Sequence, residues 1–110
     1  KTTRRAHYER FAPTDPGVFD TVLWNTRGEL TECTRGNLAL LLDDRWVTPA
    51  LGSGLLPGVG RAHWLGQGRM VEAVVTLGDL PRVQALAFIN SLRGWVDAKL
   101  VSSVRTVLAY

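Results

Sequence analysis

The stretch GSGLLPGVGRAHW, residues 52–64, is the feature of this chain from which its fold can best be worked out. Its first nine positions hold four glycines and one proline. Such a run is typical of a turn, or of a place where another group approaches the main chain closely. Residues 58–68 then predict a helix that ends near Gly66 to Gly68. The stretch therefore predicts a loop that leads into a helix.

Apolar segments on both sides of this stretch predict strands separated by short turns. NTRGEL, residues 25–30, is typical of a hairpin turn with Gly28 at positive φ, and Asp43-Asp44-Arg45 is a polar turn between two short strands. Further strands are predicted at residues 18–24, 30–34, 70–77 and 84–91.

The remaining segments are shorter or less clear. Residues 77–84 predict a short helix that Asp79 caps, with Pro81 restricted to an early position. A weak helical pattern stops at Pro13, and the tail after residue 93 fits either strands or a short helix. Strands gathered first and helices interspersed later predict an α+β fold, with a mainly antiparallel or mixed sheet and flanking helices.

Composition favours one folded domain. The 110 residues are 45% hydrophobic and carry a net charge of +3, without an internal repeat or an apolar run long enough to cross a membrane. The basic start, KTTRRAHYER, is interpreted as a solvated helix face rather than a nucleic-acid site. One cysteine, Cys33, fits a reducing compartment, so a cytoplasmic location is expected.

Side-chain patterns alone identify no catalytic centre. Two histidines, His7 and His63, are too few for a convincing metal site. The glycine-rich stretch fits either a tight loop between sheet and helix or a phosphate site, because a helix start presents backbone N–H groups to an anion. Glu32 lies either at a solvent-facing strand position or in the interior, where a carboxylate needs a partner.

Four segments in this order resemble the class IV aminotransferase family, the fold-type IV enzymes that use pyridoxal 5'-phosphate. The segments are KTTRR at the start, LWNTRGELTECTRGNLAL, TPALGSGLLPGVGRA and AFINSLRG. The resemblance covers nearly the whole chain. Within the family, NTRGELTE and FINSLRGW look most like 4-amino-4-deoxychorismate lyases, particularly the form fused behind an aminodeoxychorismate synthase component.

The resemblance implies a role for six residues, and the chemistry of its side chain makes Arg93 a seventh candidate. Lys1 matches the lysine that holds the cofactor covalently and moves protons, and Glu32 matches the carboxylate that pairs with the pyridine nitrogen. The turn that holds the phosphate through backbone N–H groups corresponds to Gly58, Val59 and Gly60. The resemblance further implies a phosphate-binding hydroxyl at Ser91, and Arg93 is a candidate for a substrate carboxylate, although an ordinary surface arginine fits there equally well.

The resemblance also implies what surrounds this chain. Residues 1–110 would be the C-terminal, cofactor-binding domain, and the small N-terminal domain that precedes the lysine in family members would be absent. A chain that starts at Lys1 rather than Met is expected to be a processed product or part of a longer protein, and poorly active alone. The expected assembly is a homodimer that takes a small-molecule substrate.

Three functions stay open at this point. The first is a lyase of folate biosynthesis that converts 4-amino-4-deoxychorismate to 4-aminobenzoate and pyruvate. The second is a transaminase of the same family that acts on branched-chain or D-amino acids. The third is a noncatalytic interaction domain that kept the fold and lost the cofactor.

Overall fold

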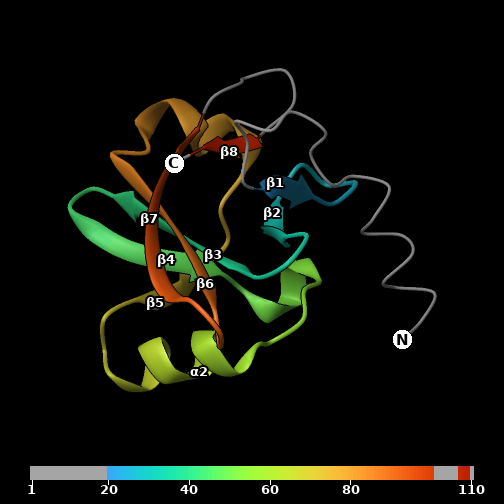
Figure 1. Cartoon of the computed structure of the whole chain (residues 1–110). Helices are drawn as coiled ribbons and strands as arrows, with labels where there is room; N and C mark the ends of the chain where they lie inside the picture. Colours follow the sequence, from blue (N-terminus) through green and yellow to red (C-terminus); the bar gives the residue numbers. More distant parts are fainter. Residues whose placement is uncertain (1–19, 101–106, 110) are drawn as a thin grey trace.

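The computed structural model describes residues 20–100 and 107–109, and it places one curved sheet around an apolar core (Figure 1). The predicted N-terminal helical pattern and Lys1 lie outside the described residues. The strands are β1 (Asp20–Trp24), β2 (Leu30–Cys33), β3 (Asn37–Leu42), β4 (Arg45–Pro49), β5 (Val71–Ala73), β6 (Ala85–Asn90), β7 (Gly94–Leu100) and β8 (Val107–Ala109). The helices are the 3₁₀ turn η1 (Leu51–Ser53), the α-helix α2 (Val59–Gly66) and the 3₁₀ helix η2 (Leu77–Arg82).

The sheet is mixed, as predicted. Its strands follow the order β2-β1-β8-β7-β6-β3-β4-β5, and among them only β4 and β5 pair in parallel within the described residues. The two hairpin turns also match the predictions: Gly28 has a φ of 74°, and Asp43 and Asp44 have φ values of 51° and 62°. Arg45, predicted in the second turn, is instead the first residue of β4. The ambiguous tail forms strands in β7 and β8.

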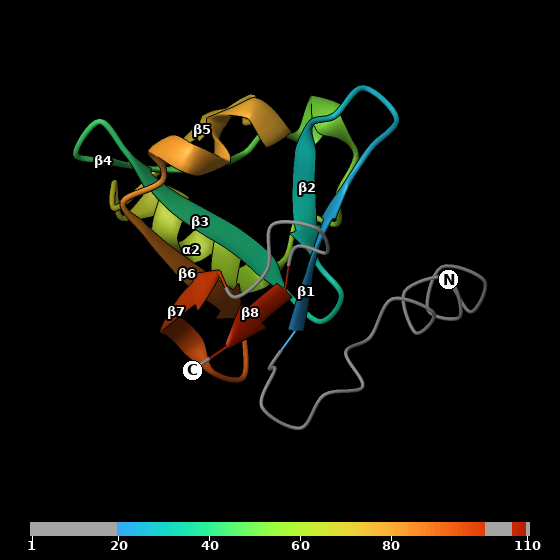
Figure 2. The same cartoon turned by 90° about the horizontal axis from the view of Figure 1, so that it is seen from above.

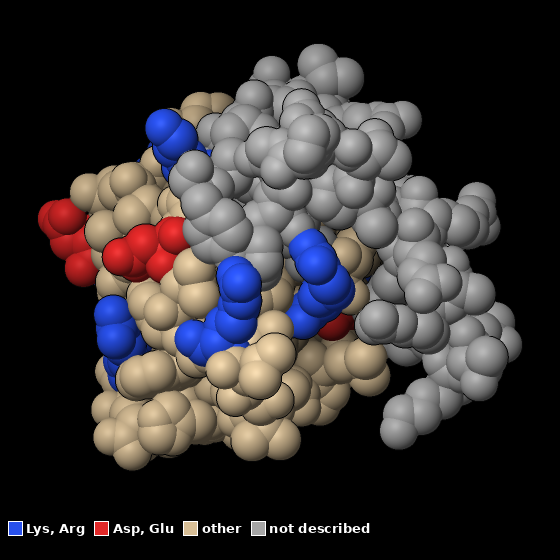
Figure 3. Space-filling view, viewed as in Figure 1, with Lys and Arg blue, Asp and Glu red and all other residues tan. Residues whose placement is uncertain are grey.

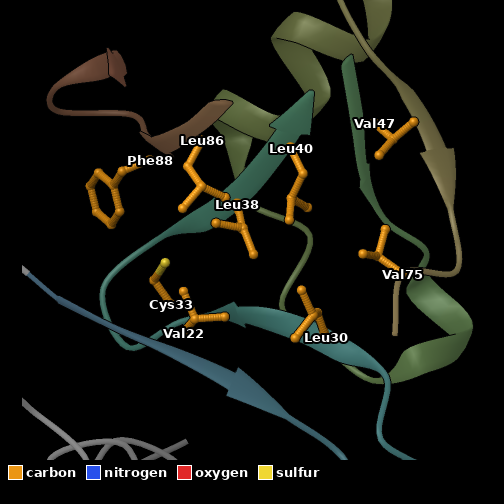
Figure 4. Packing of buried hydrophobic residues seen from close by; sticks show 9 residues of the cluster. All are labelled: Val22, Leu30, Cys33, Leu38, Leu40, Val47, Val75, Leu86 and Phe88. Atoms are coloured by element: carbon orange, nitrogen blue, oxygen red, sulfur yellow. The ribbon is translucent and has the colours of Figure 1, made fainter. Parts of the chain in front are cut away.

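Alternation along β3 and β6 divides the buried residues between the two faces of the sheet. Leu38 and Leu40 of β3 point with Leu86 and Phe88 of β6 into the larger core. There they meet Val22, Leu30 and Cys33 from β1 and β2, because the sheet curls until its two ends face each other (Figure 2 and Figure 4).

The opposite face of β3 and β6 packs against α2. Its buried residues are Ala39, Met70, Ala87 and Ile89, and around them pack Trp46, Trp64, Leu65 and Trp95. Two of the strand positions under the helix are alanines, so the helix can approach the sheet closely. Figure 2 shows α2 on the side of β3 and β6 away from β1 and β2. The sheet therefore separates the apolar core from the helix that follows the glycine-rich stretch.

The strand predicted over residues 70–77 is shorter than expected. Only Val71–Ala73 pair with β4, and the chain then leaves this edge for the β1–β2 hairpin. The Leu30 N–H donates to Val75 O at 2.7 Å, and the Leu77 N–H donates to Gly28 O at 2.8 Å. The apolar pattern of residues 70–77 continues past the end of β5 because Val75 is also buried, in the larger core rather than in the strand.

The short helix predicted at residues 77–84 is the 3₁₀ helix η2, and Asp79 caps it as predicted, from the third helical position of a capping box. Thr76 is the N-cap residue, and the Asp79 carboxylate reaches back to accept the Thr76 N–H at 2.9 Å. Pro81 is the fifth of six helical residues rather than an early one. Proline lacks a backbone N–H and therefore removes one hydrogen bond from a helix. In a short 3₁₀ helix that ends at the next residue, this loss disturbs little else, so proline is tolerated at this position.

Asp79 makes η2 sensitive to acid. The hydrogen bond from the Thr76 N–H and a second one from Arg82 Nη2, at 2.8 Å, lower the pKa of Asp79. A carboxyl with a lowered folded-state pKa stabilises the fold fully above its unfolded pKa, near 4, and this contribution is lost as the pH falls through the folded value.

Asp79→Asn is therefore expected to cost about 1 kcal/mol of unfolding free energy at pH 7 and much less at pH 3. Urea unfolding at both pH values measures the difference. The control is Asp43→Asn, which removes another carboxylate paired with Arg82, at 3.4 Å, but one whose side chain is 83% exposed. It should change stability little at either pH. An equal loss of unfolding free energy for Asp79→Asn at both pH values would contradict a stabilising role for the charged Asp79 carboxylate.

Candidate functional site

The glycine-rich stretch is held by side chains from the β1–β2 hairpin. Asn25 Nδ2 donates to Ser53 O at 2.9 Å, and Arg27 Nη2 donates to Gly52 O at 3.3 Å. Glu29 orients both donors, since its Oε1 accepts from Asn25 Nδ2 at 2.9 Å and from Arg27 Nη2 at 3.1 Å. These bonds, the one from Asn25 first, lower the pKa of Glu29. The loop predicted from glycine content is thus fixed in place by charged and amide side chains.

Glu32 lies in β2 with its side chain in the interior, so the solvent-facing alternative is wrong. The residue is 3% exposed, and the Leu56 N–H donates to its Oε1 at 3.1 Å. Leu56 stands three residues before α2, so this bond places the carboxylate beside the helix start.

Asn37, the first residue of β3, is a site residue that the sequence analysis missed. Its Nδ2 donates to Leu56 O at 2.9 Å, and its Oδ1 accepts the Gly58 N–H at 3.2 Å. The residue is buried, and its side chain bridges Leu56 and Gly58 in the loop before α2. The only signal in the sequence was an asparagine at the edge of an apolar strand, which is also common in turns.

The start of α2 is where the three predicted phosphate-binding residues lie. Gly58 is the N-cap residue, and Val59 and Gly60 are the first two residues of the helix. Backbone N–H groups in the first turn have no acceptor within the helix. The glycines are needed for packing: a Cβ on Gly58 would lie 2.6 Å from Asn37 Oδ1, and one on Gly60 would lie 3.0 Å from the Asn90 carbonyl carbon.

Ser91 and Arg93 lie in the β6–β7 turn, and both are exposed. Asn90, at the end of β6, organises this turn, because its Oδ1 accepts the Arg93 N–H at 2.7 Å. Asn90 Nδ2 also donates to Arg35 O at 3.4 Å, which joins the turn to the β2–β3 connection. Since Gly60 packs against Asn90, the β6–β7 turn and the start of α2 are neighbours.

Arg61 is a second residue that the sequence analysis missed. It follows Gly60 in the first turn of α2 and is 3% exposed. Its Nη2 donates to Pro49 O at 3.1 Å and forms an ion pair with Glu72. An arginine beside a glycine-rich loop looks like a surface residue in the sequence, and only the folded chain shows that it is buried and bound to Pro49 and Glu72.

The structure thus brings together Glu32, Gly58, Val59, Gly60 and the β6–β7 turn, and it leaves Lys1 outside the described residues. On the face seen in Figure 3, Lys and Arg side chains lie across the middle of the surface, while Asp and Glu gather toward one side. His63 is exposed on α2, and residues 20–100 and 107–109 hold no group of three potential metal ligands.

These residues fit pyridoxal 5'-phosphate in two respects. A helix start with glycines at its N-cap and second position suits a phosphate group. A buried carboxylate next to it suits a protonated pyridine nitrogen, since a carboxylate in the interior is stabilised by an opposite charge. The two features are adjacent, because the bond from the Leu56 N–H holds the Glu32 carboxylate beside the segment that ends at Gly60.

The curved mixed sheet with α2 behind it is the fold of the fold-type IV aminotransferases. The chain belongs to the class IV aminotransferase family, because residues 1–101 match the model of the family described as "Amino-transferase class IV".

Solved structures of this family resemble the chain closely. A structure named "Putative amino-acid aminotransferase", from Mesorhizobium loti, is 39% identical and has a TM-score of 0.77; the match covers 90% of this chain and 49% of that one. The 4-amino-4-deoxychorismate lyase from Pseudomonas aeruginosa is 25% identical with a TM-score of 0.74, over 84% of this chain and 37% of that one.

Among curated proteins, the chain is 32% identical to the "Putative aminodeoxychorismate lyase" of Schizosaccharomyces pombe over 77 residues, or 67% of this chain and 33% of that protein. The chain therefore spans about a third to a half of the length of these relatives. No helix among the described residues is long and apolar enough to cross a membrane.

Proposed function

We propose that this chain is the C-terminal, cofactor-binding part of a pyridoxal 5'-phosphate enzyme that converts 4-amino-4-deoxychorismate to 4-aminobenzoate and pyruvate. The observation that carries the proposal is the buried Glu32 carboxylate, held by the Leu56 N–H beside the start of α2. Membership of the class IV aminotransferase family, and similarity to two proteins named as lyases of this substrate, support it.

The bound cofactor would supply an electron-accepting ring that stabilises negative charge on a substrate carbon. In this proposal Glu32 accepts a hydrogen bond from the ring nitrogen and keeps that nitrogen protonated. The N–H groups of Val59 and Gly60 bind the phosphate, and the Ser91 hydroxyl adds a further hydrogen bond. Lys1 holds the cofactor and moves a proton to and from the reacting carbon, as a general base and acid.

Substrate recognition would come partly from the β6–β7 turn and partly from outside this chain. Arg93 lies in that turn, near the start of α2, and a guanidinium can bind a carboxylate through two parallel hydrogen bonds. Because the relatives are two to three times longer than the match, we propose that a further domain completes the pocket. A homodimer, and a fused synthase component, are part of the same proposal.

A transaminase is the second candidate, and a specific observation favours it. The solved structure at 39% identity is named as an amino-acid aminotransferase, and another, at 25% identity with a TM-score of 0.63, is named as a branched-chain one, from Thermotoga maritima. The residues proposed to hold the cofactor would serve either reaction. The two functions differ in whether pyruvate is eliminated or an amino group is passed to a keto acid.

The experiment incubates the full-length protein and pyridoxal 5'-phosphate with 4-amino-4-deoxychorismate, and separately with branched-chain or D-amino acids and a keto acid. Cofactor-dependent release of pyruvate and 4-aminobenzoate is expected. Amino transfer without pyruvate would establish the transaminase instead. If a folded protein catalysed neither reaction, the noncatalytic interaction domain would be the remaining candidate. Borohydride reduction followed by peptide mass mapping should place a pyridoxyl group on Lys1, and Lys1→Ala should carry none.

A further inference from the structure

We infer that Arg61 is a positioning residue: through Pro49 and Glu72 it fixes the first turn of α2 so that this turn selects the phosphate of the cofactor. The inference rests on the proposed function, because it needs the start of α2 to be the phosphate site. It adds a role for two residues, Arg61 and Glu72, that neither the family resemblance nor the comparisons assign.

Arg61 is anchored to two strands of the sheet. Its Nη2 donates to Pro49 O, at the end of β4, and the same nitrogen pairs with Glu72 of β5. β4 and β5 pair in parallel, with Thr48 opposite Glu72. Arg61 therefore ties the helix to two adjacent strands at once. Because it directly follows Gly60, any movement of this anchor moves the N–H groups proposed to bind the phosphate.

Arg61 completes a support of the first turn of α2 from three sides. Asn37 holds Gly58 through its Oδ1, and the main chain at Asn90 limits how far Gly60 can approach β6. Arg61 adds the third side, toward β4 and β5. Val59 lies between these supports with its own side chain 77% exposed, so its position depends on its neighbours rather than on its own packing.

Arg61 is a costly residue if its role is packing alone. Within the described residues, its Nε has no hydrogen-bond partner and is fully buried. An incompletely satisfied buried charge is often less stabilising than an apolar residue of similar volume, so a methionine would pack α2 on the sheet at least as well. An arginine adds directional hydrogen bonds, because its planar guanidinium donors fix the position of the helix relative to Pro49 O and the Glu72 carboxylate.

The pairing also explains why Glu72 is acidic at an edge strand. Its side chain is 43% exposed, yet it supplies the one carboxylate paired with Arg61 among the described residues. Glu72→Gln leaves an amide oxygen that can still accept a hydrogen bond but carries no charge. This change weakens the anchor without removing any apolar contact, so it separates positioning from packing.

The test compares binding of pyridoxal 5'-phosphate with binding of pyridoxal, which lacks the phosphate, to the purified full-length protein. Quenching of tryptophan fluorescence measures both dissociation constants, because Trp64 lies in α2. Arg61→Met and Glu72→Gln should each weaken pyridoxal 5'-phosphate binding by about tenfold or more, as expected for a misplaced binding group, while pyridoxal binding changes little. Arg61→Lys should restore part of the loss.

Arg82→Met is the matched control, because it removes an arginine that pairs with Asp79 and Asp43, two residues outside α2. It should leave the ratio of the two dissociation constants unchanged. Suppose that wild-type protein prefers pyridoxal 5'-phosphate to pyridoxal, and that both Arg61→Met and Glu72→Gln keep the wild-type ratio of the two dissociation constants. This result would overturn the inference about Arg61 but not the proposed function. Wild-type protein that binds neither compound would instead overturn the proposed function. If Arg61→Met fails to fold, Glu72→Gln decides.

Discussion

Glu32→Gln is expected to lower kcat/KM by about a hundredfold or more, whichever of the two reactions the protein catalyses. The amide keeps an oxygen that can accept the Leu56 N–H, so the loop before α2 should stay in place. What is lost is the negative charge that would keep a pyridine nitrogen protonated. The effect should therefore appear in kcat at saturating substrate rather than only in KM.

Asp97→Asn is the control for this substitution. It also replaces a carboxylate with an amide, at an exposed position on β7 where the side chain accepts a hydrogen bond from Trp95 Nε1 at 3.3 Å. Its kcat/KM should stay within about twofold of wild type, as for most surface substitutions. A Glu32→Gln protein that binds pyridoxal 5'-phosphate and retains wild-type kcat/KM would remove Glu32 from the proposed site.

The sheet could be predicted because its core strands are short apolar runs bounded by turn residues. Both faces of these strands are buried: Leu38 and Leu40 face one side of the sheet and Ala39 faces the other, and β6 does the same from Leu86 to Ile89. An apolar run of this kind is local, so it can be recognised in a single segment. The same applies to Gly28, whose positive φ follows from a short hairpin between two predicted strands.

The supports of the site could not be predicted in this way, because they join residues far apart in the chain. Asn37 contacts the loop before α2 across 19 and 21 positions, and Arg61 reaches Pro49 and Glu72 across 12 and 11. Each of these side chains is polar and looks ordinary among its neighbours in the sequence. The family resemblance found Glu32 and the glycines, which have recognisable motifs, and not the residues that hold them.

The end of β5 was mispredicted for a related reason. Residues 70–77 are apolar enough for one continuous strand, and periodicity cannot tell a strand that continues from one that changes partner. The chain exchanges β4 for the β1–β2 hairpin after Ala73, and the bridge between Glu29 and Thr76 marks the new pairing. That exchange depends on the hairpin being folded over the core, which no single segment encodes.

Gly36→Ala is expected to destabilise the fold severely. Gly36 joins β2 to β3, where a Cβ would lie 2.5 Å from Ile89 O and 2.7 Å from Phe88 Cζ. The first of these atoms belongs to the main chain of β6 and the second to a side chain with no exposed surface, so neither can yield cheaply. A loss of about 3 kcal/mol, and a fall in Tm of about 10 °C or more, is expected.

Gly66→Ala provides the contrast, since a Cβ there meets nothing within 4 Å and lies in the last turn of α2. Alanine is the better helix former, so this variant should be as stable as wild type or slightly more stable. Thermal unfolding followed by circular dichroism compares the two. If Gly36→Ala melted with Gly66→Ala, the β2–β3 connection would have to lie farther from β6 than it does here. The relative positions of two residues of the proposed site would then also differ, because Glu32 and Asn37 lie on either side of Gly36 in the chain.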